Sequence, residues 1–90
     1  MIIDNVKLQS AYDLGYESTQ LNIIELGFKA ARSMLNYTYP PGRPYTGSRE
    51  GYYYMKGEFA ALFKEGKKRG DLWYTTLNIY YANRQSLSTI

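Results

Sequence analysis

The segment that decides the fold is LNIIELGFKAARSMLNYTYPPGRPYTG, residues 21–47. Its first half places apolar side chains three and four residues apart, which is the spacing of one face of an α-helix. Its last eleven residues hold three prolines and two glycines, which exclude a helix and favour a shaped, extended loop. The sequence therefore predicts a helix from about Thr19 to Asn36, followed by a Pro/Gly-rich loop over 37–47.

The helical pattern continues towards the N-terminus. Leu14, Leu21, Phe28 and Leu35 are each seven residues apart. Asp4 is a good N-cap for a first helix, and Gly15 with the following Ser18-Thr19 pair is a place where that helix could end. Two interpretations stay open: two helices that meet near residues 15–19, or one long helix over 4–36 that bends at Gly15.

A further helix is predicted after the loop. Ser48 is its expected N-cap, and Tyr52, Met55, Phe59, Leu62 and Phe63 form its apolar face. Gly51 and Gly57 each weaken this helix by about 1 kcal/mol relative to alanine, but they would let another helix approach closely. Gly66 is expected to end it, which makes Lys67-Lys68-Arg69 a hinge or turn.

A last helix is expected from Asp71, with a β-hairpin over 74–81 as the less favoured alternative because that segment is rich in β-forming residues. The fold class is therefore all-α: one small domain over residues 1–90 with three or four helices. The expected core is Leu14, Leu21, Ile24, Phe28, Leu35, Phe59, Leu62, Trp73 and Leu77.

Composition excludes several classes of protein. The chain has no cysteine and no histidine, so it lacks thiolate metal ligands, catalytic thiols and the commonest general base. The N-terminus does not resemble a signal peptide, and no stretch approaches the roughly 20 apolar residues that span a bilayer. We expect a cytoplasmic protein without cofactor, metal or membrane partner.

Neither acidic pairs nor glycine-rich segments predict an active site. Asp13 and Glu17 are four residues apart, and Glu58 and Glu65 seven, but both pairs lie among cations on expected solvent faces. The stretch PPGRPYTGSREG lacks the Gly-Lys-Ser/Thr ending of a nucleotide-binding loop. The sequence therefore predicts a binding protein rather than an enzyme.

Charge and tyrosine content point to a binding surface in the second half of the chain. Residues 1–45 sum to zero charge, whereas 46–90 carry the whole net charge of +3, and eleven tyrosines exceed the needs of so small a core. Successive helical residues are about 100° apart, so at least one of Tyr52, Tyr53 and Tyr54 must face outward. The predicted binding residues are Arg43, Tyr45, Arg49, Tyr53, Tyr54, Lys56, Lys64, Lys67, Lys68, Arg69, Tyr81 and Arg84.

Residues 36–60 resemble the ribosome modulation factor family and its small phage-borne relatives. Pro44-Tyr45, then Arg49, then Tyr54-Met55-Lys56-Gly57 is similar to the family's Pro-Tyr, polar stretch and aromatic-Gly order, and Ala11 with Gly15-Tyr16 resembles an earlier pair. Tyr54 stands where the family has tryptophan, and the likeness does not reach 66–90. The resemblance implies a basic, helical protein that binds ribosomal RNA.

Two functions are expected from these observations. The first is a small regulatory protein, of the kind that phages encode, which binds RNA, a ribosome or single-stranded DNA through tyrosine and Lys/Arg side chains. The alternative is an inhibitor that disables a host enzyme or defence complex through a tyrosine-rich surface. A homodimer through the apolar seam of the first helices is a further expectation.

Overall fold

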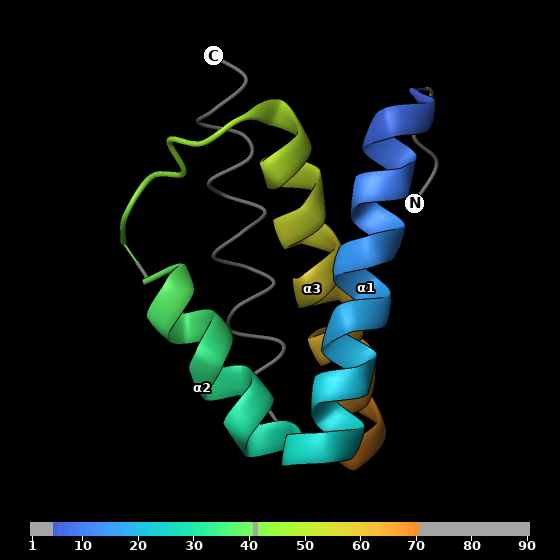
Figure 1. Cartoon of the computed structure of the whole chain (residues 1–90). Coiled ribbons are helices and arrows are strands. Elements are labelled where there is room, and N and C mark those ends of the chain that lie inside the picture. Colours follow the sequence, from blue (N-terminus) through green and yellow to red (C-terminus); the bar gives the residue numbers. More distant parts are fainter. Residues whose placement is uncertain (1–4, 41, 71–90) are drawn as a thin grey trace.

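The computed structural model describes residues 5–40 and 42–70, which form three helices: α1 (Val6–Leu26), α2 (Phe28–Thr38) and α3 (Arg49–Arg69). No strand occurs in this part of the chain, so the all-α prediction is confirmed. Helices α1 and α3 run side by side in the same direction, α2 runs in the opposite direction on the other side of α3, and the loop after α2 returns to the start of α3 (Figure 1). The predicted last helix, its hairpin alternative and the core candidates Trp73 and Leu77 lie outside the described residues.

The bend between the first two helices lies at Gly27, so both interpretations that placed it near Gly15 were wrong. Gly27 has φ 94° and ψ 158°, a backbone conformation that residues with a Cβ avoid. It ends α1 by donating its N–H to the Ile23 carbonyl and begins α2 by accepting from Ala31 N–H. At the other end of α1 the cap is Asn5, whose side-chain oxygen accepts from the N–H groups of Lys7 and Leu8.

The bounds of α2 and α3 correct two further predictions. Helix α2 extends to Thr38, two residues past the expected end, because the first proline follows only at Pro40. Ser48 caps α3 as predicted, with its Oγ accepting from Gly51 N–H at 3.1 Å. The basic run Lys67-Lys68-Arg69 is the last turn of α3 rather than a hinge, because Gly70 in the left-handed conformation supplies the end of the helix and Gly66 does not.

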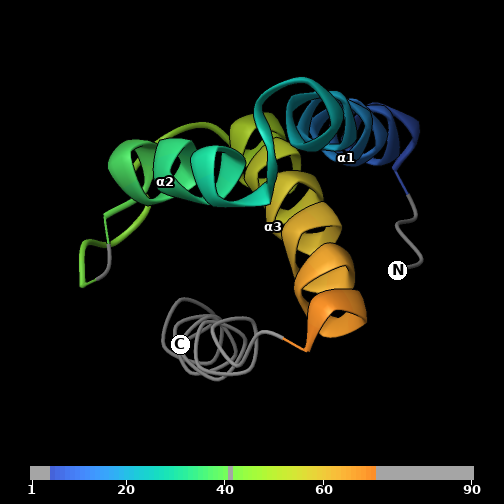
Figure 2. The ribbon, with the colours of Figure 1, turned by 90° about the horizontal axis from the view of Figure 1, so that it is seen from below.

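Two glycines let α1 and α3 cross almost backbone to backbone (Figure 2). A Cβ on Gly15 would overlap the Tyr54 carbonyl, and a Cβ on Gly57 would overlap the Tyr12 carbonyl. The relation is reciprocal, since each glycine faces the main chain of the other helix. Gly57 therefore does what its position predicted, whereas Gly15 is a packing residue inside α1 and not a break.

The apolar core lies between α2 and α3. It consists of Phe28, Ala31 and Leu35 from α2 with Met55, Phe59 and Leu62 from α3. The partly buried Ile23, Tyr39, Tyr45, Tyr52 and Phe63 cover its margins. Four of the predicted core residues, Phe28, Leu35, Phe59 and Leu62, are confirmed.

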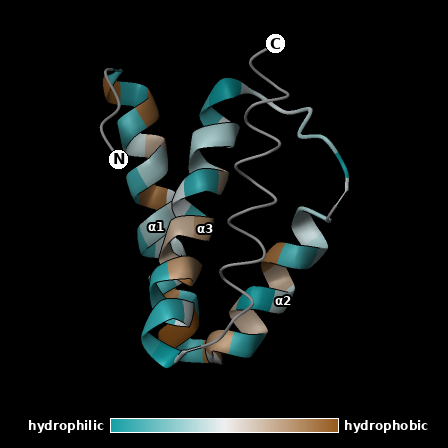
Figure 3. Cartoon of the chain, turned by 180° about the vertical axis from the view of Figure 1, so that it is seen from behind, coloured by the Kyte–Doolittle hydropathy of each residue, from teal (hydrophilic) through white to brown (hydrophobic). Residues whose placement is uncertain are grey.

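Leu14, Leu21 and Ile24 were wrongly predicted as core. Their side chains are 59%, 57% and 79% exposed, and apolar residues recur along the length of α1 (Figure 3). The residues that α1 buries are Leu8, Gly15 and Thr19. Where the main chain of α3 comes closest, α1 carries the small residue Gly15, and Leu14, Leu21 and Ile24 lie away from that contact.

Candidate functional site

Cations from α2 and α3 meet around one aromatic ring. The Cζ atoms of Arg32 and Arg69 lie 5.6 and 5.3 Å from the centroid of the Phe28 ring, which is itself buried. Both distances are within the range of cation–π attraction. Because the corner between α1 and α2 lies at the same end of the molecule as the end of α3, these residues form one surface (Figure 1).

Further positive charge surrounds this ring. An open pocket of about 540 Å³ is lined by Leu26, Gly27, Phe28, Lys29, Ala30 and Arg69. Lys67 and Lys68 are exposed in the same turn as Arg69. We call the set Lys29, Arg32, Lys67, Lys68 and Arg69 the basic end of the molecule.

Part of this positive charge also stabilises the end of α3. Cations in the last turn of a helix interact favourably with its dipole, and Lys67, Lys68 and Arg69 occupy that position in α3. Arg69 Nε lies 3.0 Å from Glu65 Oε1 on the preceding turn, in an exposed pair whose contribution is about 0.3–0.5 kcal/mol. The cations of α2 gain no such stabilisation, because Lys29 lies in the first turn of that helix, where its dipole does not favour cations, and Arg32 lies in the next turn.

The predicted binding residues do not form one surface. Arg43, Tyr45 and Arg49 lie at the loop and the start of α3, whereas Lys64 and the last turn lie at its other end. A helix of 21 residues is about 32 Å long at 1.5 Å per residue, so the two groups cannot contact one small ligand together. Tyr81 and Arg84 lie outside the described residues.

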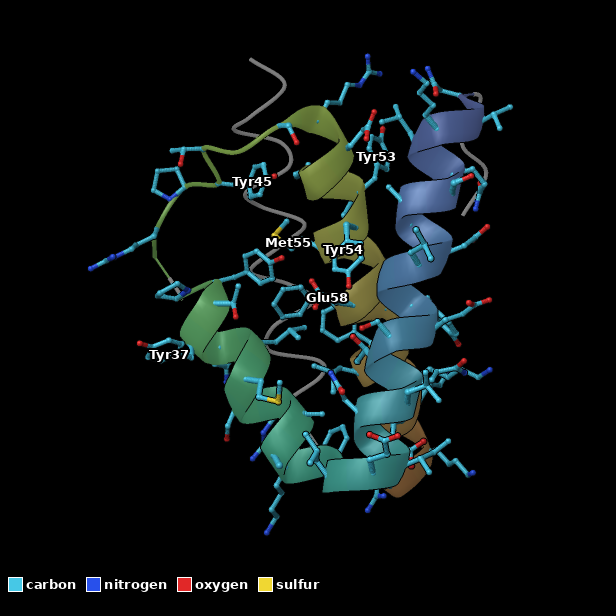
Figure 4. The ribbon with its side chains drawn as sticks, viewed as in Figure 1. Tyr37, Tyr45, Tyr53, Tyr54, Met55 and Glu58 are labelled. Atoms are coloured by element: carbon cyan, nitrogen blue, oxygen red, sulfur yellow. The ribbon has the colours of Figure 1, made fainter. Side chains whose placement is uncertain are left out.

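The tyrosines at the loop stabilise the turn into α3. Tyr45 donates its hydroxyl proton to the Ser48 carbonyl at 2.8 Å, and its ring meets Tyr52 edge-on at 5.7 Å. Tyr52 in turn contacts Tyr53 at 5.6 Å and lies under the Lys56 ammonium at 5.3 Å. Tyr54 lies between α3 and α1 (Figure 4). All four rings are partly buried, and those of Tyr45, Tyr52 and Tyr53 contact one another, so less of their surface is available for stacking than predicted.

Tyr37 was not among the predicted binding residues, although it is the most exposed large hydrophobic side chain of the described part of the chain. It is 88% exposed near the end of α2 and points away from the other helices (Figure 4). Helical geometry could have identified Tyr37 as exposed. Residues two apart in a helix lie on nearly opposite sides, and Leu35 is buried, so Tyr37 faces outward. It lies away from the basic end, where α2 begins.

One half-buried acid, Glu58, lies beside a tyrosine at the margin of the core. The Tyr39 hydroxyl donates to Glu58 Oε1 at 2.9 Å, and the Tyr39 ring packs against Phe59 at 5.9 Å. Burial raises the pKa of Glu58, while the hydrogen bond from Tyr39 opposes that change. Burial, with the Glu58 carboxylate beside it, also raises the pKa of Tyr39 well above its usual value. The expectation that Glu58 lies on a solvent face was therefore wrong.

Glu58→Gln is expected to raise the free energy of unfolding at pH 7 and to change it much less at pH 4. A carboxyl whose pKa is higher in the folded chain stabilises the fold below its unfolded pKa of about 4.3, and that contribution is lost as the pH rises through the folded pKa. The amide keeps an acceptor for Tyr39 but does not ionise.

Urea unfolding of both proteins between pH 4 and 7 measures the difference in the free energy of unfolding. A second variant, Tyr39→Phe, removes the hydrogen bond that opposes the rise in the Glu58 pKa, so its stability should depend on pH more steeply than that of the wild type. Parallel pH profiles for the wild type and Glu58→Gln would contradict the assignment.

Other kinds of site receive no support from the described residues. No three acidic side chains gather in residues 5–40 and 42–70 in a way that would hold a metal ion. No helix in that part of the chain is long and apolar enough to cross a bilayer. Comparison of the whole chain with protein-family models, with curated proteins and with solved structures finds no match.

Proposed function

We propose that this chain is a small regulatory protein that binds the phosphate groups of a nucleic acid, alone or within a ribonucleoprotein complex, through its basic end. The observation that carries the proposal is the gathering of Lys29 and Arg32 from α2 with the last turn of α3 around Phe28. Cations from separate helices at one end of a molecule give a local positive field that attracts a polyanion.

The geometry favours phosphate contacts over base stacking. Lys and Arg side chains at the basic end are exposed or half-exposed, whereas Phe28, the ring among them, is buried under two guanidinium groups. Phosphate contacts position a protein on a strand without reading its sequence. The proposed binding is therefore strongly dependent on salt and weakly dependent on base sequence.

A protein-directed inhibitor that uses Tyr45, Tyr53 and Tyr54 as anchors has weaker support. Hot-spot aromatic residues bury themselves in a partner, but these three rings are already half-buried in their own chain. Tyr45 is also held by its hydrogen bond to the Ser48 carbonyl.

The test is a polarisation titration of labelled single-stranded RNA and DNA over a series of salt concentrations. The triple variant Lys67→Gln/Lys68→Gln/Arg69→Gln is expected to bind about 10- to 100-fold more weakly at low salt and to lose about 2 from the slope of log K against log salt, at about 0.7 per phosphate contact.

The matched control removes the same charge at the opposite end of the molecule. Lys7, Arg43 and Arg49 are exposed, and Lys7→Gln/Arg43→Gln/Arg49→Gln leaves the basic end intact. This variant should keep most of the affinity. Binding that does not respond to salt, or an equal loss in both triple variants, would show that the basic end is not the binding site.

A further inference from the structure

The face of α1 that points away from α3 exposes apolar side chains that no other helix of the described residues covers. Val6 and Ile24 are 81% and 79% exposed, and Leu14 and Leu21 are each more than half exposed. At about 100° per residue these four side chains fall on the side of α1 opposite Gly15 and Thr19, which face α3. We call Val6, Leu14, Leu21 and Ile24 the α1 stripe. Single exposed apolar residues are ordinary, but a stripe along most of a helix is typical of an interaction site.

Acidic side chains lie within and beside the α1 stripe. Asp13, Glu17 and Glu25 are all exposed, and Lys7 is the one cation of α1. Glu17 lies within the stripe, three residues after Leu14 and four before Leu21, so it is on the same face. The stripe therefore combines apolar side chains with a local charge opposite in sign to that of the basic end.

This charge argues against a second copy of the chain as the partner. In a parallel pair of α1 helices in register, each Glu17 would meet the Glu17 of its copy. In an antiparallel pair centred on the stripe, Asp13 would meet the copy's Glu17 and Glu17 the copy's Asp13. Like charges at such positions are destabilising, and both arrangements bring them together next to the apolar contact.

We infer that the α1 stripe docks a basic amphipathic helix of a partner protein. Such a helix would place leucine-like side chains, spaced by three, four and seven residues, against Leu14, Leu21 and Ile24. Its flanking lysines or arginines would lie opposite Asp13, Glu17 and Glu25. The stripe spans residues 6–24, which is about 27 Å of helix and long enough for about five turns of a partner. The stripe shares no residue with the basic end, so substitutions in the stripe leave the side chains proposed to contact phosphate in place.

The test uses two synthetic helical peptides with the same leucine heptads and either lysine or glutamate at the flanking positions. Fluorescence titration against the full chain should detect binding of the lysine peptide and at least tenfold weaker binding of the glutamate peptide. Leu21→Gln/Ile24→Gln should weaken the lysine peptide at least tenfold. Glu17→Lys should weaken the lysine peptide and strengthen the glutamate peptide, a reversal that a loss of folding would not produce.

The matched control is Met34→Gln/Tyr37→Gln, which removes two exposed apolar side chains from α2 and should leave binding of the lysine peptide unchanged. Equal affinity of the two peptides, or equal loss in the α1 and α2 variants, would overturn the proposal. Sedimentation of the wild type as a dimer that Leu21→Gln/Ile24→Gln converts to a monomer would also overturn it, because the occupant would then be a second copy.

Discussion

Replacing Gly57 by alanine is expected to lower the free energy of unfolding by about 3 kcal/mol, the upper part of the usual range for overpacking. In an ordinary helix the same change stabilises by about 1 kcal/mol, so the expected sign is reversed. The cause is the Tyr12 carbonyl, which a Cβ at residue 57 would overlap. Main-chain atoms cannot swing aside as the end of a side chain can, so α1 and α3 would have to move apart. Urea unfolding at neutral pH measures the change.

The crossing of α1 and α3 predicts the behaviour of two other glycines. Gly15→Ala should destabilise to a similar degree, because its Cβ would overlap the Tyr54 carbonyl from the other helix. Gly51→Ala is the control within α3, because the nearest atom there is the Tyr45 hydroxyl oxygen, at the end of a movable side chain. We expect a much smaller effect at Gly51. Stabilisation by Gly57→Ala would show that α1 and α3 are farther apart than described.

The parts of the fold that were predicted correctly depend on short stretches of sequence. Ser48 caps α3 because its own hydroxyl reaches Gly51 N–H, three residues away. Phe28 and Leu35 in α2, and Phe59 and Leu62 in α3, are buried because their spacing puts each pair on one face of its helix. Pro40 and Pro44 keep the connection from continuing α2 as a helix. Each of these outcomes follows from the chemistry of neighbouring residues.

The incorrect predictions concern which glycine bends the chain and which apolar residues are buried. Gly15 and Gly27 look alike in sequence, but Gly15 faces the Tyr54 main chain of α3, whereas Gly27 takes a positive φ and forms the bend. The seven-residue spacing of Leu14, Leu21, Phe28 and Leu35 suggested one continuous face. The bend at Gly27 leaves the first two leucines outside while the later two residues are buried. The spacing of apolar residues alone does not show which glycine bends the chain or which leucines are covered by another helix.

The residues of the candidate site were predicted only in part. The last turn of α3 was identified from its run of cations, but Lys29 and Arg32 were not, because they lie in a segment whose charges balance overall. The guanidinium group of Arg32 reaches the basic end only because α2 turns back at Gly27 and lies beside α3. The excess of tyrosine was read as a binding signal, yet Tyr39, Tyr45 and Tyr52 pack at the margins of the core. In a small domain, half-buried phenol rings extend a thin core while their hydroxyls remain hydrogen-bonded or hydrated.

The arrangement of α1 is tested by one substitution made at two positions. Leu62→Ala is expected to lower the free energy of unfolding by about 3 kcal/mol, because the side chain is 0% exposed and its removal leaves a cavity among Phe28, Leu35 and Phe59. Leu21→Ala removes the same atoms from a side chain that is 57% exposed and should change stability by no more than about 0.5 kcal/mol. Both leucines were expected in the core from their spacing, so the comparison separates spacing from packing.

The same pair of variants relates stability to docking at the α1 stripe. If Leu21 were a core residue, its truncation would cost nearly as much as that of Leu62, and parallel urea unfolding curves for the two variants would contradict the described fold. If Leu21 is exposed, its truncation leaves the free chain stable but weakens binding of the lysine peptide. The reason is that the apolar area of Leu21 leaves water only in the complex. Leu62→Ala, measured where the variant is still folded, should bind that peptide as the wild type does, because Leu62 lies in the core between α2 and α3 and not on the stripe.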